Sequence, residues 1–335
     1  MHEFFLLIVS IIIASGTFWR VDARAADSVL EAAQKEAAVV VYTGSSAADA
    51  AKLIAAFESK YPFVKVNLFR GNNERVLNRI LTEGRTGSFF FDVATIDGLN
   101  GWVLKEHDYL QPHNSKETQA FPAEFQDPTG LLPCCMTVVA NMIAYNTGQV
   151  AKKDAPKTYQ DLLDPKWKGS MGMDPDEAEW FRALISSWGK EKTVQYFSEL
   201  AKQNPSMRRG HTLLANLLAA GEFPIGVNTF GHRILELKSE GAPVDLVYAE
   251  PLILGPRHLL LSKRAPHPNA GRLFIDYTLS AEGQTLLASL SRTVVRPGIK
   301  LKQASLMDGT KVYPIKPEMA KGYEEITKLY YSIMK

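Results

Sequence analysis

The chain has 335 residues, of which 46% are hydrophobic and 22% charged, a composition typical of a soluble globular protein that is too long for one ordinary core. Its 38 basic and 36 acidic residues leave a formal net charge of +2. Because no run of Lys and Arg with interleaved aromatic residues occurs either, the sequence argues against a nucleic-acid partner. The length of the chain favours two lobes.

The N-terminus has the pattern of a secretory signal peptide. Phe4 to Ala14 is almost wholly apolar, and Ala23-Arg24-Ala25 offers an A-x-A cleavage site. The apolar run is short for a bilayer span, so we expect residues 1–25 to be removed on export to the periplasm. The usual positive charge before the run is missing, which leaves an uncleaved anchor as the alternative. No cysteine lies near the cleavage site, so we do not expect a lipoprotein.

The first hundred residues after this segment alternate between strand and helix patterns. The expected strands are Val39–Tyr42, Val64–Phe69 and Phe91–Ile96. The helix after the first strand begins with a capping box at Ser46, and Asp97-Gly98 turns the chain after the third. This β-α-β-α-β-α order implies a parallel sheet in an α/β fold.

The middle of the chain predicts two passages between the lobes. Met136–Tyr145 reads as the strand that leaves the first lobe, and Pro251–Pro256 reads as the return, followed by a separate strand at His258–Ser262. We therefore assign 27–138 with 258–310 to one lobe, and 139–257 with 311–335 to the other. Helices are further expected at Glu191–Lys202, within 268–290 and at Tyr323–Met334.

Gly210 to Gly241 has the strongest local pattern. It reads as a helix, a turn at Gly221, a buried strand at Phe223–Val227, a polar loop at Asn228–Arg233 and a second helix. Open α/β sheets bind their ligands where strands end and helices begin, so we expect this loop to contact a small ligand.

The two cysteines, Cys134 and Cys135, are adjacent. Neighbouring cysteines can pair only through a strained ring, so we expect two free, buried thiols in an apolar segment. No disulfide framework and no C-x-x-C site occurs.

In this order and spacing, several short segments resemble the periplasmic substrate-binding proteins of ABC transporters, in the branch that includes ferric-iron-binding proteins. The segments are Val40-Val41-Tyr42 with Gly44, Phe91-Asp92-Val93, Asp164 to Gly169, Ala220-Gly221-Glu222, His267 to Ala270 and Ser280 to Gln284. The resemblance covers nearly the whole mature chain. It implies the two-lobed type II fold, with interleaved α/β lobes, two hinge crossings and a cleft that closes on a solute.

The same resemblance points to specific positions. In ferric-binding relatives a His in the first loop, an acid after the third strand and two adjacent tyrosines hold iron; here these positions are Ser46, Asp97 and Gly231-His232. Hard Fe³⁺ prefers anionic oxygens, so the loss of both phenolates argues against simple ferric binding. The helix start that holds an anion in those relatives is Asp174-Pro175-Asp176-Glu177 here, which would repel one.

We therefore expect a ligand site from both lobes, with Asp97 and His232 as the candidate metal ligands. The predicted ligand-binding residues are Ser45, Ser46, Asp97, Asp174, Glu177, Asn228, His232 and Arg233. Most of them have an ordinary alternative. Ser46 can cap its helix, Asp97 can be a turn residue, and Asp174-Pro175-Asp176-Glu177 can form a self-sufficient helix start.

The sequence predicts a solute-binding component of an ABC importer that closes by a hinge motion on a metal ion, a metal chelate or a small polar organic molecule. Its partners would be an inner-membrane permease and the solute, and we expect a monomer without a resident cofactor, a bound metal being the transported ligand. Because no G-x-S-x-G, H-E-x-x-H or phosphate-binding Gly-Lys loop occurs, we expect no enzyme. An exported enzyme and a sensory receptor on the same scaffold are the alternatives.

Overall fold

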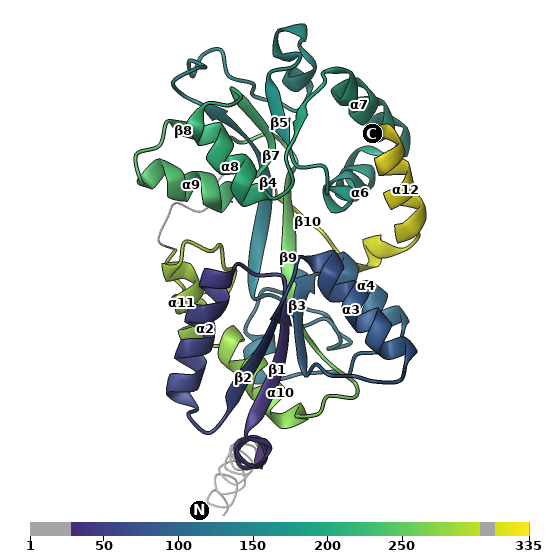
Figure 1. Cartoon of the computed structure of the whole chain (residues 1–335), viewed down its shortest axis with the longest axis vertical. Helices are drawn as coiled ribbons and strands as arrows, with labels where there is room; N and C mark the ends of the chain where they lie inside the picture. Colours follow the sequence, from purple (N-terminus) through teal and green to yellow (C-terminus); the bar gives the residue numbers. More distant parts are fainter. Residues whose placement is uncertain (1–27, 302–311, 335) are drawn as a thin grey trace, which may run out of the picture.

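The computed structural model describes residues 28–301 and 312–334 and has two lobes, one above the other in Figure 1. One ten-stranded sheet runs through both lobes in the order β2-β1-β3-β9-β4-β7-β5-β6, with β8 paired to β4 and β10 to β9. The strands are β1 (Ala38–Thr43), β2 (Lys65–Arg70), β3 (Val93–Asp97), β4 (Thr137–Asn146), β5 (Met171–Met173), β6 (Ser206–Met207), β7 (Ile225–Phe230), β8 (Val244–Val247), β9 (Leu252–Leu261) and β10 (Val312–Pro314).

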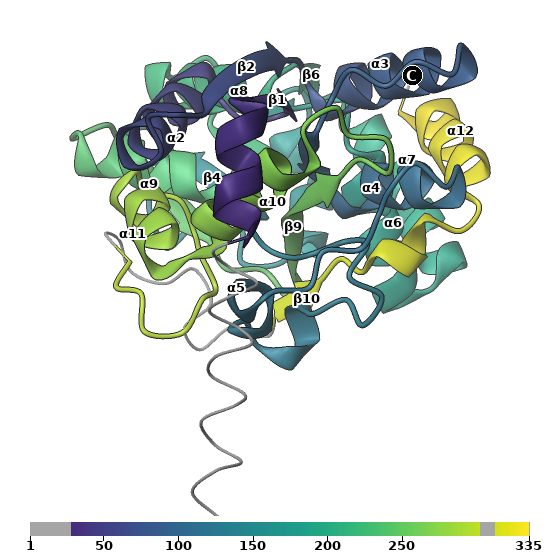
Figure 2. The same cartoon turned by 90° about the horizontal axis from the view of Figure 1, so that it is seen from below.

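Helices cover both faces of the sheet in each lobe (Figures 1 and 2). Those of the lower lobe, after a first helix over 28–36, are α2 (Ala47–Lys60), α3 (Asn73–Arg85), α4 (Gly98–Glu106), α5 (Lys116–Gln119), η1 (Ala123–Phe125), α10 (Pro268–Leu279) and α11 (Ala281–Ser289). The remainder are η2 (Gln160–Leu163), η3 (Pro165–Trp167), α6 (Ala178–Trp188), α7 (Lys190–Lys202), α8 (His211–Ala220), α9 (Gly231–Ser239), η4 (Pro317–Ala320) and α12 (Tyr323–Ile333).

The predicted parallel start of the sheet is confirmed. β1 lies between β2 and β3 and is parallel to both, with Val41 opposite Leu68 on one side and Val93 on the other. Each connection is a helix, α2 or α3, whose apolar side packs on the sheet because its buried residues recur at helical spacing. The carboxyl ends of β1 and β3 therefore point the same way, toward the upper lobe (Figure 1).

β4 and β9 form the hinge. Each has ten residues, and they pair antiparallel from Thr137 opposite Arg257 to Asn141 opposite Ile253. Beyond this shared segment, β9 continues into the lower lobe beside β3, and β4 continues into the upper lobe between β7 and β8. The two segments predicted at 251–256 and 258–262 are thus one continuous strand. The exact lobe boundaries stay a prediction.

Four clusters of buried apolar residues form the core, and they follow the two faces of the sheet in each lobe. In the upper lobe one cluster lies under α6, α7 and α12 and another under α8 and α9; in the lower lobe one lies under α2, α10 and α11 and another under α3 and α4. Their largest fully buried side chains include Trp180, Phe181, Phe197, Phe57, Phe274, Ile80 and Leu104. Each lobe therefore has its own three-layer core.

The predicted start of α6 is wrong. The helix begins at Ala178, four residues after the expected cap at Asp174, and Glu177 in the capping position makes no side-chain capping bond. The reason is that the Asp174 carboxylate is bound elsewhere: it accepts the backbone N–H groups of Asp176 at 3.0 Å and of Gly210 at 2.7 Å. The four residues 174–177 therefore form a loop.

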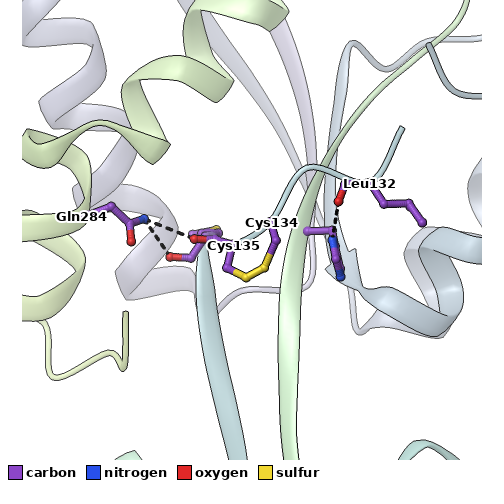
Figure 3. The surroundings of a disulfide bond; sticks show 6 residues. Leu132, Cys134, Cys135 and Gln284 are labelled. Atoms are coloured by element: carbon purple, nitrogen blue, oxygen red, sulfur yellow. Dashed lines mark hydrogen bonds between the residues drawn. A yellow bond between two sulfur atoms is a disulfide. The ribbon is translucent and has the colours of Figure 1, made fainter. Parts of the chain in front are cut away.

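The prediction of free thiols is also wrong, although both cysteines are buried as expected. Figure 3 shows the sulfurs of Cys134 and Cys135 on the same side of the segment, joined in a disulfide. Beside them Gln284 of α11 donates its amide to the carbonyls of Cys135 and Met136, at 3.4 and 3.0 Å. The residues that lead into β4 are thus bound to α11.

The predicted signal peptide, residues 1–25, lies outside the described residues. Of the helices between 28 and 334 that the structure describes, none combines the length and the apolar character needed to cross a membrane.

Candidate functional site

Ser45 and Ser46 follow β1 at the start of α2. The Ser46 hydroxyl accepts the backbone N–H of Asp49 at 3.1 Å and caps the helix, as the sequence pattern predicts. Ser45 is half-buried, and its hydroxyl has only a weak contact with the Met136 sulfur at 3.9 Å. The cap therefore uses one hydroxyl, and the other stays available at the edge of the lower lobe.

Asp97 lies at the end of β3 and caps α4. The residue is 3% exposed, and its carboxylate accepts the backbone N–H of Asn100 at 2.9 Å and the Asn100 side-chain amide at 2.7 Å. In the sheet it is the register partner of Arg257 on β9, so both side chains belong to the same face. The predicted acid thus occupies the expected strand end, and its structural role is that of a helix cap.

Asn228 of β7 holds the loop that precedes α6. Its side-chain oxygen accepts the backbone N–H of Asp174 at 2.9 Å, and its amide donates to the Asp174 carbonyl at 3.0 Å. Because the side chain is fully buried and both of its ends are used, its contacts fix the loop and leave no free end for a solute. The position was predicted to be near the site, and this structural role was not.

Glu177 and His211 form a close pair in the upper lobe. The Glu177 carboxylate lies 2.6 Å from Nε2 of His211 and accepts the Asn141 amide at 2.9 Å. The His211 ring stacks on Phe230, with 3.7 Å between ring centroids, and its Nδ1 lies 3.0 Å from the Asn228 carbonyl. Sequence reasoning missed His211, because this contact joins α8 to a loop more than thirty residues earlier.

Charge and burial act in opposite directions on this pair. Burial alone would lower the pKa of His211, but the carboxylates of Glu177 and Asp174 raise it overall. Burial also raises the pKa of Glu177, and His211 partly counteracts this. The two carboxylates therefore favour the charged form of the imidazole.

His232 and Arg233 begin α9. Arg233 contacts Glu236 at 2.6 Å and the Asn216 oxygen at 2.9 Å, so its guanidinium is engaged with the α8–α9 side of the lobe. His232 is half-buried, and burial together with the positive charges of Arg292, His211 and Arg257 holds its pKa well below the usual range. The ring is therefore neutral, as a metal-ligating histidine must be.

The predicted metal pair of Asp97 and His232 remains a prediction. Within the residues that the structure describes, no group of three or more His, Cys, Asp and Glu side chains is placed to hold a metal ion. The Asp97 carboxylate is already bound by Asn100, and the described residues give it no ion pair.

Sequence reasoning missed a group of residues on one face of the hinge. Arg257 of β9 lies 3.5 Å from the carboxylate of Glu179 in α6, and Gly255 lies one rung further along the same face, beneath that carboxylate. Asn141 of β4 occupies the next rung and binds Glu177. These residues are single polar positions in apolar strands and helices, and only the strand register brings them together.

Glu74 of α3 approaches the same group from the lower lobe. Its side chain is exposed at the surface, but neighbouring atoms partly desolvate its carboxylate, and this desolvation raises the pKa of Glu74. The negative charges of Asp97, Asp176 and Glu177 raise it further. Asp176 in turn accepts the hydroxyl of Tyr331 from α12 at 3.3 Å. Carboxylates from both lobes and the hinge residues Arg257 and Asn141 therefore converge on one region.

A family profile described as bacterial extracellular solute-binding protein matches residues 102–308. Iron uptake protein A1 of Synechocystis sp. is 28% identical over 245 residues, which are 67% of this chain and 66% of that protein, just under two thirds of its length.

Two solved structures share the fold. Iron-bound HitA of Pseudomonas aeruginosa superimposes with a TM-score of 0.78 at 22% identity, covering 88% of this chain and 99% of its own. The periplasmic binding protein AfuA of Actinobacillus pleuropneumoniae, with exogenous fructose-6-phosphate bound, has a TM-score of 0.79 at 22% identity and covers 88% and 98%. The two-lobed fold predicted from the sequence is thereby confirmed. Since the family profile spans more than half of the chain, the protein belongs to the bacterial extracellular solute-binding proteins.

Proposed function

We propose that the protein is the periplasmic solute-binding component of an ABC importer. It captures a small solute between its lobes, closes about β4 and β9, and presents the closed form to an inner-membrane permease. The supporting observation is that polar and charged side chains from α3, β3, β4, α6 and β9 converge between two separately packed lobes. In this proposal the chain is exported with removal of residues 1–25 and acts as a monomer.

The solute is a small polar organic molecule or a metal chelate rather than a bare ferric ion. The tyrosine pair of ferric-binding relatives corresponds to Gly231 and His232 here, and Gly231 is buried at the start of α9. Asp97 and Asn228, two predicted ligand residues, use their polar atoms for internal hydrogen bonds. The free anionic oxygen ligands that Fe³⁺ needs are therefore not assembled among the described residues.

A thermal-shift screen of the full-length mature protein tests this function. The panel contains ferric ion, ferric citrate, citrate, sugars, amino acids and amines, each at millimolar concentration. Binding to the folded state alone raises stability by about 2.7 kcal/mol at a ligand concentration of one hundred times Kd, so one solute class should raise the melting temperature clearly. The recovered solute should be chemically unchanged. A protein that converts the solute, or that no compound stabilises, contradicts the proposal.

A further inference from the structure

The region between the lobes has more acidic than basic groups. Glu74 of α3, Asp97 of β3, and Asp176, Glu177 and Glu179 at the start of α6 affect one another's charge. Figure 1 shows α3 and α6 on the same side of the hinge strands. Their basic partners are Arg257 with Glu179, His211 with Glu177 and the exposed Arg209 with Asp176. Within the described part of the chain, neither Glu74 nor Asp97 has an ion pair.

A second observation is independent of this charge. Asn141 is 8% exposed; its amide donates to Glu177, and its oxygen Oδ1 is buried without a hydrogen-bond partner among the described residues. The Glu179 oxygen Oε1 is buried and likewise lacks a donor. A buried acceptor left without a donor costs about 1–3 kcal/mol, so both atoms favour a ligand that brings donors.

The sheet register places these two acceptors side by side. Asn141 is opposite Ile253, and Val139, two residues earlier on the same face, is opposite Gly255. A methyl group on Gly255 would lie 3.6 Å from each Glu179 oxygen, so the Glu179 carboxylate covers the rung next to Asn141. Both acceptors therefore face the same space, between the hinge and the first turn of α6.

The chemistry of these groups selects the ligand. An ammonium group has three N–H donors and no acceptor, and it carries the positive charge that the cluster lacks. A neutral polyol would supply donors and leave the carboxylates uncompensated, and an anion would be repelled by the acids at the start of α6. Consistent with a missing cation, burial and the nearby negative charge of Asp97 raise the pKa of Glu179 to about 8 in spite of Arg257.

We propose that the solute carries a protonated amine, which donates to Asn141 Oδ1 and to the Glu179 carboxylate, with Glu74 closing over it from the lower lobe and the negative charge of the capping Asp97 adding to the attraction. This inference rests on the proposed function, since it names the class of solute for the same site. Arg257 stays between Glu179 and Asp97, and its Nη1 has no hydrogen-bond partner among the described residues. Its positive charge disfavours a cation that brings no hydrogen-bond donors of its own.

Titration calorimetry with matched pairs of compounds tests it. The amines are putrescine, ethanolamine and γ-aminobutyrate, and their amine-free counterparts are 1,4-butanediol, ethylene glycol and butyrate. At least one amine should bind, and its counterpart should bind at least about a hundredfold more weakly. Glu179→Gln should weaken the amine at least about tenfold, and Glu74→Gln, at an exposed position, should do the same without affecting the fold. Glu325→Gln, an exposed acid on α12, is the matched control and should leave the affinity unchanged.

Three results would overturn the inference: binding of none of the amines, equal binding of an amine and its counterpart, or amine affinity that Glu74→Gln and Glu179→Gln both leave intact. If ferric citrate or a sugar binds while the amines do not, the amine assignment fails and the proposed solute-binding function stands. If neither the amines nor the wider panel binds, both fail. The melting temperature of each ligand-free variant shows whether a lost affinity reflects a lost fold.

Discussion

At the scale of single residues, the site separates into side chains that hold its walls and side chains that remain open. Ser46, Asp97 and Asn228 make internal hydrogen bonds that fix a helix start or a loop. Asn141 and Glu179 each retain a buried oxygen without a donor. Both kinds are polar residues, and only the open ones have binding capacity left for a solute.

Glu179 makes the stability of the ligand-free protein depend on pH. Its pKa in the folded state is raised from 4.5 to about 8, mainly by burial and next by the charge of Asp97. Between these two values the folded state binds a proton that the unfolded state has lost, so stability falls as pH rises. Glu179→Gln cannot titrate and should escape this loss. Because each pKa unit corresponds to about 1.4 kcal/mol, the variant should gain about 2 kcal/mol or more relative to the wild type between pH 5 and pH 8.

Urea unfolding at several pH values measures this difference. The substitution also replaces the carboxyl beside Arg257 by an amide, and this change of contact adds an offset that is present at every pH, so the change in the difference with pH is the quantity to follow. Glu325→Gln should track the wild type at every pH. A difference between Glu179→Gln and the wild type that stays flat from pH 5 to pH 8 would show that Glu179 titrates near its ordinary value.

How much of the site the sequence predicts depends on how local each contact is. Ser46 could be placed because a helix cap bonds to the backbone three residues later. Asp97, expected as a ligand or a turn residue, makes the same kind of bond to Asn100. The contacts of Glu177 with His211 and Asn141, and of Glu179 with Arg257, join residues 34 to 78 positions apart in the sequence, and nothing in the local pattern of either partner indicates them. Asp174 shows the converse. Its local pattern predicts a helix cap, but its carboxylate accepts the backbone N–H of the distant Gly210 instead.

At the scale of elements, the alternating pattern predicts which segments are strands and helices. It fails where a strand continues past residues that interrupt its apolar pattern. β9 was expected as two segments because Gly255 and Pro256 interrupt its apolar run. In the structure both residues pair with β4 at Val139 and Val138, and this long-range pairing carries the strand through. The short strands β6 and β10, which have two and three residues, carry too little pattern to be recognised.

The corner between α10 and α11 gives a test at this scale. Alanine is favoured over glycine inside a helix by about 1 kcal/mol, so Gly283→Ala would ordinarily stabilise α11. Here a methyl group at Gly283 would lie 2.2 Å from the Tyr277 carbonyl oxygen and 2.8 Å from that of Thr278. Both are backbone atoms, so the two helices must move apart, which costs about 1–3 kcal/mol. We expect a net loss of stability and a lower melting temperature.

Ser289→Ala, at an exposed position of the same helix, is the control and should change stability little. If Gly283→Ala is as stable as the wild type, the helices can separate without loss and the corner is not rigid. The corner matters for the site because Gln284, the next residue, donates to the carbonyls of Cys135 and Met136 just before β4 (Figure 3). A displaced α11 would therefore move the start of a hinge strand.

At the scale of the whole molecule, the two lobes have largely separate cores and share the hinge strands β4 and β9. Leu99 of α4 is an exception, since it packs with the upper-lobe cluster under α6. Inter-domain contacts of this limited kind permit relative motion of the lobes. The carboxylates of Glu74 and Asp97 belong to the lower lobe and those of Glu177 and Glu179 to the upper, so a cation between them is attracted by both only when the lobes approach.

Small-angle X-ray scattering measures that approach directly. A ligand shifts an open–closed equilibrium only by its difference in affinity for the two states, and an amine bound to one lobe alone would gain nothing from closure. We therefore expect the amine that binds by calorimetry to reduce the radius of gyration of the wild type when it is saturating. Glu74→Gln removes the contact from the lower lobe and leaves Asn141 and Glu179 in place, so at the same fractional saturation it should show a smaller reduction, whereas Glu325→Gln should match the wild type. An unchanged radius of gyration in the saturated wild type would mean that the amine binds without closing the hinge, and that the two lobes do not share the solute.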